Sequence, residues 1–486
     1  MRFPLPTVAT ALALTLLAAT PAWAREPVAP MQVPANGVIG VEEAYLSPEF
    51  WVSRLAQDDA GAPDSVVMDR ATIEAQNARL LRMDDSMHDL RALPASLDRA
   101  QVAGWIEGLS QRPERQLYDV AHAPVPAATL DAIVANLALG AIPERQDTRY
   151  GMVVRRAALR TFPTDLRVFS SDDDTDIDRF QESALFPGTP VAIAHQSGDG
   201  QWLFVVSPRY AAWIEKQAVA EGTRDAVFAH VDKAPYRIVG GAKVRTVFTR
   251  EQPQLSELQL DMGVRAPLAD VPPDQAVNGQ HQYTSWILEL PLRNADGSLG
   301  FAPALLQKTA DTSGDYLPLT RANIIRQAFK FLGERYGWGH SYNGRDCSGF
   351  VSEVYRSMGV QLPRNTSDQS VSPALDRIHF EPGDGRDKRM AAVAALQVGD
   401  LVYIPGHVMM VIGRIGDVPY MIHDTNGGSY LGADGKLHSM HLNAVSMTPL
   451  TPLMFNAKQS YIDRITNIVR VARRPAHDGS AMKDRP

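Results

Sequence analysis

Between residues 48 and 145 the hydrophobic positions recur with the spacing of amphipathic helices. In the stretch DRATIEAQNARLLRM, Ile73, Leu80 and Leu81 fall on one helical face. Asp69, the first residue of this stretch, is placed to cap the helix N-terminus. The stretch ATLDAIVANLAL repeats the helical pattern more cleanly. The pattern therefore predicts a helical region, and we see no catalytic cluster in its sequence.

From about residue 148 the pattern changes to short apolar runs separated by Gly, Pro and Asp, which is typical of strands and turns. The stretch HQSGDGQWLFVVS predicts a hairpin, with Asp199 and Gly200 at the turn and Trp202 opening the second strand. A second strand-rich block runs from about 235 to 305 and includes the turn RNADGSLG. Each block predicts a small β-barrel.

Helical spacing returns at about residue 319, in the stretch TRANIIRQAFKFLGERY. Its apolar stripe consists of Ile324, Ile325, Ala328, Phe329 and Leu332. A further helix is predicted to begin at Cys347 and to end at Gly359, with the apolar face Phe350, Val351, Val354, Tyr355 and Met358. Two apolar strands follow, at 408–412 and 420–423. If they pair as a hairpin, the start of the first strand and the end of the second lie near the same end of the sheet.

The N-terminus reads as a secretory signal peptide over residues 1–24. Arg2 supplies a basic start, an apolar run follows, and small residues end at Ala24. A membrane anchor is the alternative, but the run is too short for a span and is broken by Pro21. We therefore expect an exported protein, periplasmic or secreted, that is cleaved after Ala24 and has no membrane span.

Composition narrows the class of partner. The chain has 486 residues, 45% of them hydrophobic and 21% charged, so several globular domains are expected. Its net charge of -7 makes nucleic acid a poor candidate partner.

The acidic run SDDDTDID (171–178) lacks the glycine and terminal glutamate of a calcium loop and predicts a solvated loop. HSMH (438–441) has no companion ligands for zinc, so we expect no metal and no cofactor.

Cys347 is the only cysteine in the chain. In an oxidising compartment it could be an inert buried thiol, an intermolecular disulfide partner or a nucleophile. Its predicted place at a helix N-terminus favours the nucleophile, because unpaired backbone N–H groups stabilise a thiolate and lower the thiol pKa. The same N–H groups could hold a developing oxyanion.

Such a nucleophile needs a base, and His407 is the first candidate because it opens the strand 408–412. A half-buried strand-end histidine that bonds locally is the alternative interpretation. His423 ends the next apolar strand, so the predicted hairpin would allow it to orient His407.

Residues 319–470 resemble the NlpC/p60 family of papain-like cysteine peptidases. The matching stretches are YGWG (336–339), DCSGF (346–350), LPRNTSDQ (362–369), VGDLVYIPGHVMMVIG and MIHDTNGG. The resemblance implies a triad of Cys347, His407 and His423, with Tyr336 lining the oxyanion region. The segment RIGDVPY lengthens the hairpin between the two histidines, so Asp424 or Asn426 is an alternative third member.

The whole chain resembles the family branch that has an N-terminal helical domain and two bacterial SH3-like domains before the peptidase. The implied fold class is α+β multidomain. The predicted division is signal peptide 1–24, extended lead-in and helical domain 25–145, SH3-like barrels 146–230 and 231–318, peptidase 319–473 and disordered tail 474–486. Members of this branch are wall hydrolases that cleave the γ-D-glutamyl–diamino acid bond of stem peptides with a free N-terminal L-alanine.

The resemblance also implies that Asp346 and Ser348 bind the alanine amine. A helix cap is the alternative role for Asp346. Tyr210, in SPRYAAWI, is the candidate contact from a barrel that closes the cleft, or else an ordinary barrel-rim aromatic residue. His340 stands where the family has a second glycine, and we interpret it as a turn residue rather than a substrate contact.

The expected partners are peptidoglycan stem peptides or released murein peptides. The alternatives are a wall amidase or acyl transferase that uses the same triad, and a wall-binding scaffold with little activity.

Overall fold

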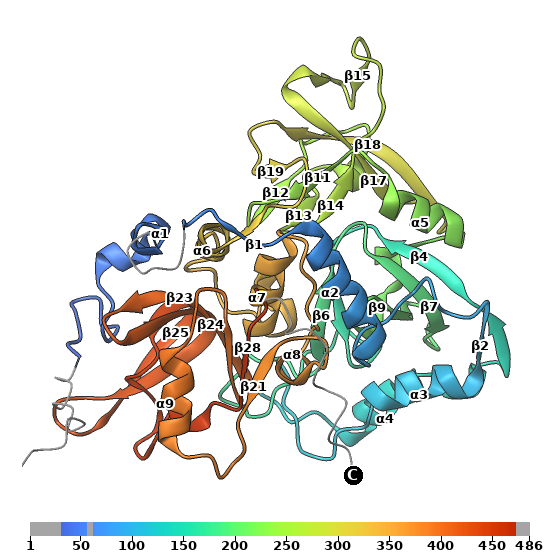
Figure 1. Ribbon diagram of the computed structural model, residues 1–486. Helices are drawn as coiled ribbons and strands as arrows, with labels where there is room; N and C mark the ends of the chain where they lie inside the picture. Colours follow the sequence, from blue (N-terminus) through green and yellow to red (C-terminus); the bar gives the residue numbers. More distant parts are fainter. Residues whose placement is uncertain (1–30, 56–61, 473–486) are drawn as a thin grey trace, which may run out of the picture.

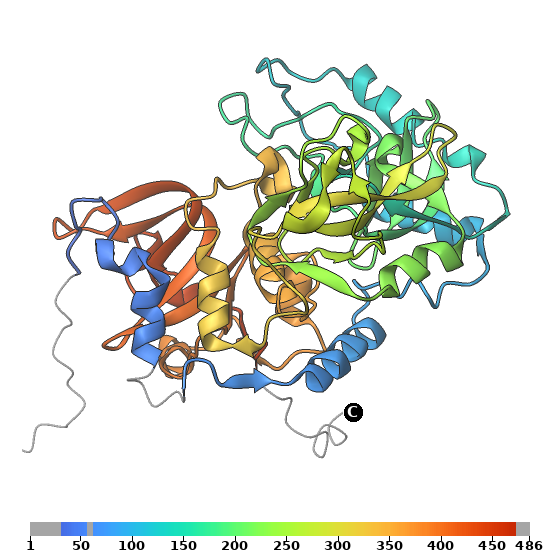
Figure 2. The same cartoon turned by 90° about the horizontal axis from the view of Figure 1, so that it is seen from above.

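The computed structural model describes residues 31–55 and 62–472. The signal peptide predicted at 1–24 and the tail predicted at 474–486 lie outside the described residues. The protein is an α+β multidomain chain (Figure 1). The strand-rich segments of residues 149–313 lie on one side, and the sheet of residues 377–469 lies on the other (Figure 2). The domain boundaries stay predictions.

The C-terminal part of the chain is built on an antiparallel sheet in the order β21-β28-β22-β23-β24-β26-β27, with β25 paired to β24. Its strands are β21 (Arg377–His379), β22 (Leu401–Ile404), β23 (His407–Ile415), β24 (Val418–Leu431), β25 (Leu437–Pro449), β26 (Leu453–Asn456), β27 (Gln459–Ser460) and β28 (Asn467–Val469). The helices of this part are α6 (Arg321–Phe329), α7 (Cys347–Arg356), α8 (Thr366–Val371) and α9 (Arg386–Ala394).

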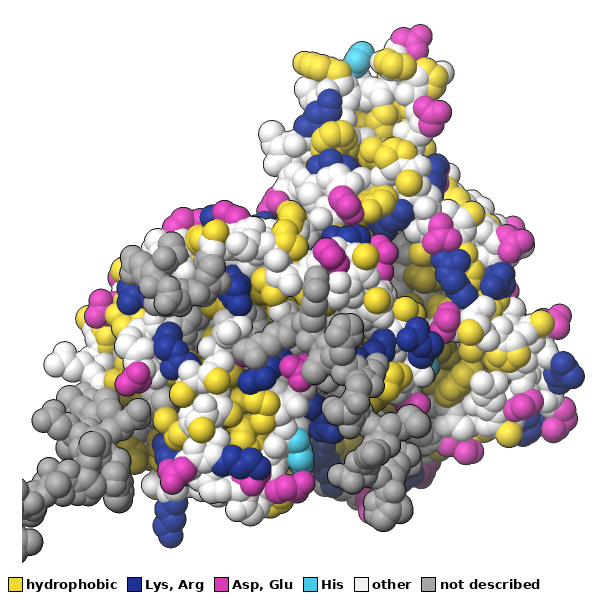
Figure 3. All heavy atoms as spheres, viewed as in Figure 1, with side chains coloured by type: hydrophobic (Ala, Val, Ile, Leu, Met, Phe, Trp, Pro, Cys, Tyr) yellow, Lys and Arg dark blue, Asp and Glu magenta, His cyan; other side chains and the backbone are white. Residues whose placement is uncertain are grey.

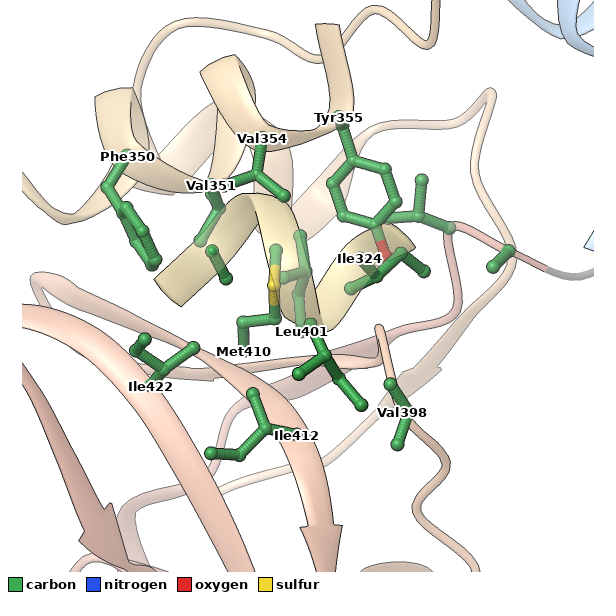
Figure 4. Packing of buried hydrophobic residues seen from close by; sticks show 14 of the residues in the cluster. Ile324, Phe350, Val351, Val354, Tyr355, Val398, Leu401, Met410, Ile412 and Ile422 are labelled. Carbon is green, nitrogen blue, oxygen red and sulfur yellow. The ribbon is translucent and has the colours of Figure 1, made fainter. Parts of the chain in front are cut away.

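Helices α6 and α7 pack on one face of this sheet, and Figure 4 shows the contact. The predicted stripes of both helices are buried there, because Phe350, Val351, Val354 and Tyr355 meet Met410, Ile412 and Ile422 of the strands. Burying apolar side chains of this size contributes about 1.5–3 kcal/mol each. The start of α7, and with it Cys347, is thus fixed by a rigid core.

The first strand-rich segment forms one seven-stranded sheet in the order β10-β4-β7-β8-β9-β5-β6. Its strands are β4 (Arg149–Val153), β5 (Ala157–Arg160), β6 (Gln181–Leu185), β7 (Pro190–Gln196), β8 (Trp202–Val206), β9 (Ala211–Glu215) and β10 (Val219–Gly222). The predicted hairpin is confirmed, since β7 and β8 flank Asp199 and Gly200, and Trp202 opens β8. We call this segment the first barrel.

The second strand block is divided among four small sheets, of which all but the β15-β16 hairpin contribute to one core. They are β14-β11-β19, β12-β13, β17-β18 and the projecting hairpin β15-β16. The bounds are β11 (Tyr236–Val239), β12 (Lys243–Arg245), β13 (Gln259–Asp261), β14 (Arg265–Pro267), β15 (Ala276–Val277), β16 (Gln280–His281), β17 (Ser285–Arg293), β18 (Leu299–Gln307) and β19 (Thr312–Ser313). The helix α5 (Arg224–Asp232) connects the first barrel to this block.

The N-terminal helices are divided between two cores instead of forming one of their own. They are α1 (Pro48–Leu55), α2 (Arg70–Met83), α3 (Arg99–Leu109) and α4 (Ala127–Ala135). Trp51 of α1 and Ile73 of α2 pack in the core around α6 and α7. Ile106 of α3 and Leu130 of α4 pack instead with Trp213 of the first barrel. As predicted, the side chain of Asp69 caps α2 by accepting from the Thr72 N–H.

Two aspartates of the acidic run are not solvated, so that prediction is wrong for them. Asp178 is 1% exposed and forms an ion pair with Arg160 at 2.5 Å. Asp176 forms an ion pair with Arg335, across to the C-terminal part of the chain. The end of the run thus forms ion pairs with other parts of the chain, while its middle, residues 172–174, is exposed.

On the face shown in Figure 3, basic and acidic side chains are interspersed over the surface. Among residues 31–55 and 62–472, no helix is long and apolar enough to cross a membrane. Within the same residues, no group of three or more His, Cys, Asp or Glu side chains is placed to hold a metal ion.

Candidate active site

Cys347 is the first residue of α7, as the sequence predicts. Asp346 caps the helix by accepting a hydrogen bond from the Gly349 N–H at 2.8 Å. The Cys347 Sγ lies 3.7 Å from the Thr366 Oγ1 of α8, and the backbone N–H of Val408 also bonds to the sulfur. Thr366 and Val408 therefore hold the thiol between α8 and the strand that His407 opens.

The predicted lowering of the Cys347 pKa is wrong for this structure. Burial raises the pKa of the thiol to about 12, and the neighbouring Asp346 carboxylate adds to the shift. The hydrogen bonds from Thr366 and Val408 oppose it without cancelling it. Desolvation of the sulfur thus outweighs the helix N-terminus, and the resting group is a neutral thiol.

His407 and His423 lie together at the start of the hairpin formed by β23 and β24. The His407 Nε2 is 2.7 Å from the His423 Nδ1, and the His423 Nε2 is 2.9 Å from the Thr448 Oγ1 of β25. Burial lowers the pKa of His407 to about 4, and burial together with His407 lowers that of His423. Both imidazoles are therefore neutral at pH 7.

We assign the tautomers of this pair by taking Thr448 as the acceptor at the end of the chain of hydrogen bonds. With Thr448 as the final acceptor, His423 donates through Nε2 and accepts at Nδ1 from His407 Nε2–H. His407 Nδ1 then carries the free lone pair, and among the described residues it makes no hydrogen bond. No hydrogen bond joins Cys347 Sγ to His407 in the described structure, so thiol and base are neighbours along β23 without being bonded.

The two alternative third members are placed differently. The inserted RIGDVPY segment only extends the β23–β24 hairpin, with Gly416 in its turn, and leaves His423 beside His407. Asp424 is fully buried, and neither carboxylate oxygen has a hydrogen-bond partner among the described residues. Burial raises its pKa well above the usual range, and nearby Asp346 and Glu334 add to this. Asn426 is exposed.

Asp346 has a cationic partner that sequence reasoning missed. Arg364 Nη2 donates to Asp346 Oδ2 at 2.7 Å, and Nη1 donates to Ser348 Oγ at 2.9 Å. Ser348 in turn donates to Asp346 Oδ1 at 3.1 Å. Burial alone would raise the pKa of Asp346, but Arg364 and His340 bring it to about 2. The carboxylate is therefore ionised and already neutralised within the protein.

His340 is a turn residue, as interpreted, but its ring has a structural role the sequence did not indicate. Its backbone φ is 67°, and its side chain is buried. The ring accepts from Arg364 Nη2 at Nδ1, at 3.0 Å, and contacts Glu353 Oε1 through Nε2, also at 3.0 Å. A Cβ at Gly349 would lie 2.5 Å from the ring, so glycine after Ser348 makes room for it.

The first barrel contributes directly to the site through β6. Trp338 Nε1 donates to the Gln181 carbonyl at 3.0 Å, and Arg364 Nε donates to Ser183 Oγ at 2.6 Å. The Tyr210 hydroxyl donates to Glu182 Oε2 at 2.5 Å. Glu182 has no Lys or Arg partner among the described residues. In the sequence it is a glutamate in an ordinary strand pattern, so nothing there indicated that it lies near the site.

An open cleft of about 550 Å³ passes over Cys347. Its lining includes Trp338, Asp346, Cys347, Ser348, Asn365, Thr366 and Tyr403. Tyr336 is 9% exposed. Burial raises the pKa of its phenol, and the nearby Cys347 and Asp346 raise it further, which places the phenol close to the thiol. The geometry thus joins a thiol, a neutral imidazole pair and a walled cleft, which is an arrangement suited to acyl transfer.

Two family models match the chain. Residues 333–458 match the NlpC/P60 family, and residues 167–215 match the SH3 domain of the SH3b1 type. The chain is 36% identical over 86 residues to a gamma-D-glutamyl-L-lysine dipeptidyl-peptidase of Bacillus cereus, which is 16% of this chain and 26% of the relative. It is 27% identical over 110 residues to dipeptidyl-peptidase 6 of Lysinibacillus sphaericus, which is 22% of this chain and 34% of that relative.

These alignments span about a quarter to a third of the relatives' length. A solved structure described as a novel NlpC/P60 endopeptidase from Photobacterium damselae subsp. piscicida resembles the whole fold, with a TM-score of 0.69 at 17% identity. That likeness covers 85% of this chain and 95% of the other. The chain therefore carries an NlpC/P60 domain over residues 333–458 and, ahead of it, an SH3-like domain over residues 167–215.

Proposed function

We propose that this protein is an exported cysteine peptidase of peptidoglycan stem peptides. It hydrolyses the bond between γ-D-glutamate and the diamino acid when the peptide begins with a free L-alanine. The observation that carries the proposal is the cleft over Cys347, beside the hydrogen-bonded pair His407–His423 and against β6 of the first barrel.

In the proposed mechanism His407 acts as a general base on a neutral thiol. Its Nδ1 takes the proton of Cys347 as the sulfur attacks the γ-carbonyl carbon of the substrate. His423 accepts from Nε2–H and keeps that tautomer in place while His407 is cationic. The oxyanion is stabilised by the N–H groups at the start of α7, with Tyr336 beside them.

His407 then returns the proton to the leaving amine of the diamino acid, as the C–N bond breaks and a thioester forms at Cys347. Water, deprotonated by the same imidazole, attacks the thioester, and the thiol is regenerated with release of the L-Ala-γ-D-Glu dipeptide. Hydrogen bonds of the resting site that are long or absent are expected to tighten only when substrate is bound.

Selectivity for a free N-terminus is assigned to the end of the cleft that the first barrel closes. The charge of Asp346 is balanced by Arg364, so Asp346 and Ser348 form a polar wall rather than a free anion. Glu182 does not line the cleft itself; it lies on β6 beside Ser183, and its carboxylate accepts from Thr161 and Tyr210 and has no basic partner among the described residues. We assign it the largest share of the ammonium binding, as a charge-assisted hydrogen bond.

The test is incubation with L-Ala-γ-D-Glu-diaminopimelate and with its N-acetylated form, followed by identification of the products by mass. The proposal predicts L-Ala-γ-D-Glu and free diaminopimelate from the first peptide, with little product from the second. Cleavage at a different bond points to a wall amidase or acyl transferase. If neither the peptides nor intact sacculi are cleaved, the protein is a wall-binding scaffold.

A further inference from the structure

A second cavity, of about 180 Å³, lies between the first barrel, the second strand block and the C-terminal end of α7. Its lining includes Phe186, Arg209, Gly263, Tyr316, Arg356 and Arg364. None of its lining residues lines the cleft over Cys347. It lies where three parts of the chain meet and adjoins the active site, because Ser183, Tyr210 and Arg364 also line it.

The charged side chains that line this cavity are of one sign, and the nearby carboxylates Glu353, Asp261 and Asp346, which partly offset them, lie outside its lining. Three arginines line it, and none of its lining residues is an Asp or a Glu. Arg364 is paired with Asp346, but within the described residues neither Arg209 nor Arg356 forms an ion pair with a carboxylate. Arg209 has one hydrogen bond, a 3.5 Å contact from Nη1 to the Leu362 carbonyl.

Arg356 adds an orphaned donor at the cavity wall. Its Nη2 donates to the Met262 carbonyl, but its buried Nε has no hydrogen-bond partner among the described residues. Gly263, at φ 77°, has no side chain there, and a Cβ would lie 2.7 Å from that Nε. The Arg356 Nε thus lies against Gly263, which also lines the cavity. Leaving a buried polar atom without a hydrogen-bond partner costs free energy.

We propose that this cavity binds a small anion bearing a carboxylate or phosphate group, held by Arg209 and Arg356. The planar guanidinium fork matches both groups, and two such side chains can share one anion. Burial, with the neighbouring Arg356 and Arg364, lowers the pKa of Arg209 to about 9, and a bound anion would relieve this repulsion. Arg356 lies 4.8 Å from the Phe186 ring centroid, so part of the cavity wall is apolar. This wall favours a compact ligand over an extended one.

The experiment is calorimetric titration of the full-length protein with sodium phosphate and with sodium acetate, at an ionic strength held constant with sodium chloride. The variants are Arg209→Gln and Arg356→Gln. Arg250→Gln, at an exposed arginine of the second strand block, is the matched control for loss of one charge. Thermal unfolding of each variant without added anion shows that it is folded.

We expect saturable binding in the wild type and in Arg250→Gln, weakened at least about tenfold in Arg209→Gln, which removes one charge-assisted contact. Arg356→Gln should have the same effect. Binding of phosphate alone assigns the site to phosphate esters, and binding of both anions assigns it to carboxylates as well. Absence of binding in the wild type, or equal binding in folded Arg209→Gln, would overturn the proposal.

Discussion

The Nε2 of His407 lies 2.7 Å from the Nδ1 of His423, and this contact defines the roles of both rings. With Thr448 taken as the acceptor from His423, the proton between the two rings is assigned to His407. In the proposed mechanism the Nδ1 of His407 is then the atom available to the thiol, with His407 as the base and His423 as the residue that positions it.

Replacement of the two histidines should therefore have unequal effects. His407→Ala removes the proton acceptor, and kcat is expected to fall by about 10²–10⁴-fold. His423→Ala should cost less, because water can partly replace an orienting group. The measurement is steady-state cleavage of the stem tripeptide by folded variants. A larger loss in His423→Ala than in His407→Ala would reverse the assigned roles.

Asp424 offers a test of the competing third member. Burial raises its pKa well above the usual range, which favours the neutral acid, and Asp424→Asn keeps the shape of that form. We expect kcat/KM to stay within a few-fold of the wild-type value. His423→Gln is the matched control on the neighbouring position. If Asp424→Asn lost activity by about 10²-fold or more, Asp424 would belong to the catalytic group.

The reactivity of Cys347 should depend steeply on pH. With a thiol pKa of about 12, the thiolate fraction in the resting enzyme is very small at pH 7. Labelling by iodoacetamide is expected to be slow at neutral pH and to rise about tenfold per pH unit up to pH 10. Free cysteine, whose pKa is about 8.5, is the reference and should level off first. A labelling rate already at its plateau at pH 7 would mean a preformed thiolate.

Glu182 is expected to control the preference for a free N-terminus. In the wild type, N-acetylation of the L-alanine should lower kcat/KM by about ten- to a hundredfold or more, since the half-buried Glu182 carboxylate loses its partner. Glu182→Gln should weaken this preference more than Asp346→Asn does, because Asp346 is already neutralised by Arg364. The comparison uses free and acetylated peptides with all three proteins. Equal rates for both peptides in the wild type would contradict the role assigned to Glu182 and would leave Asp346 with its structural contacts to the helix start and Arg364.

Local periodicity accounts for the parts that the sequence predicted well. The face of α7 and the β23–β24 hairpin follow from side chains a few residues apart, so Cys347 and the histidines could be placed on their elements. Arg364 and Glu182 could not be found in this way, because their contacts with His340 and Tyr210 depend on how separate segments pack.

The pKa of Cys347 shows the same limit. A helix N-terminus is visible in sequence and lowers a thiol pKa, but burial of the sulfur depends on the folded surroundings and has the larger effect here. His340 likewise gave the signal of a turn, while its role between Arg364 and Glu353 depends on burial of both partners.

The role of Cys347 as the nucleophile of the proposed γ-D-glutamyl peptidase is tested most directly by the rate of L-Ala-γ-D-Glu-diaminopimelate cleavage by wild type and Cys347→Ala. Thermal unfolding establishes that the variant is folded. We expect release of L-Ala-γ-D-Glu by the wild type and no detectable release by Cys347→Ala. Cleavage by folded Cys347→Ala at the wild-type rate would contradict it.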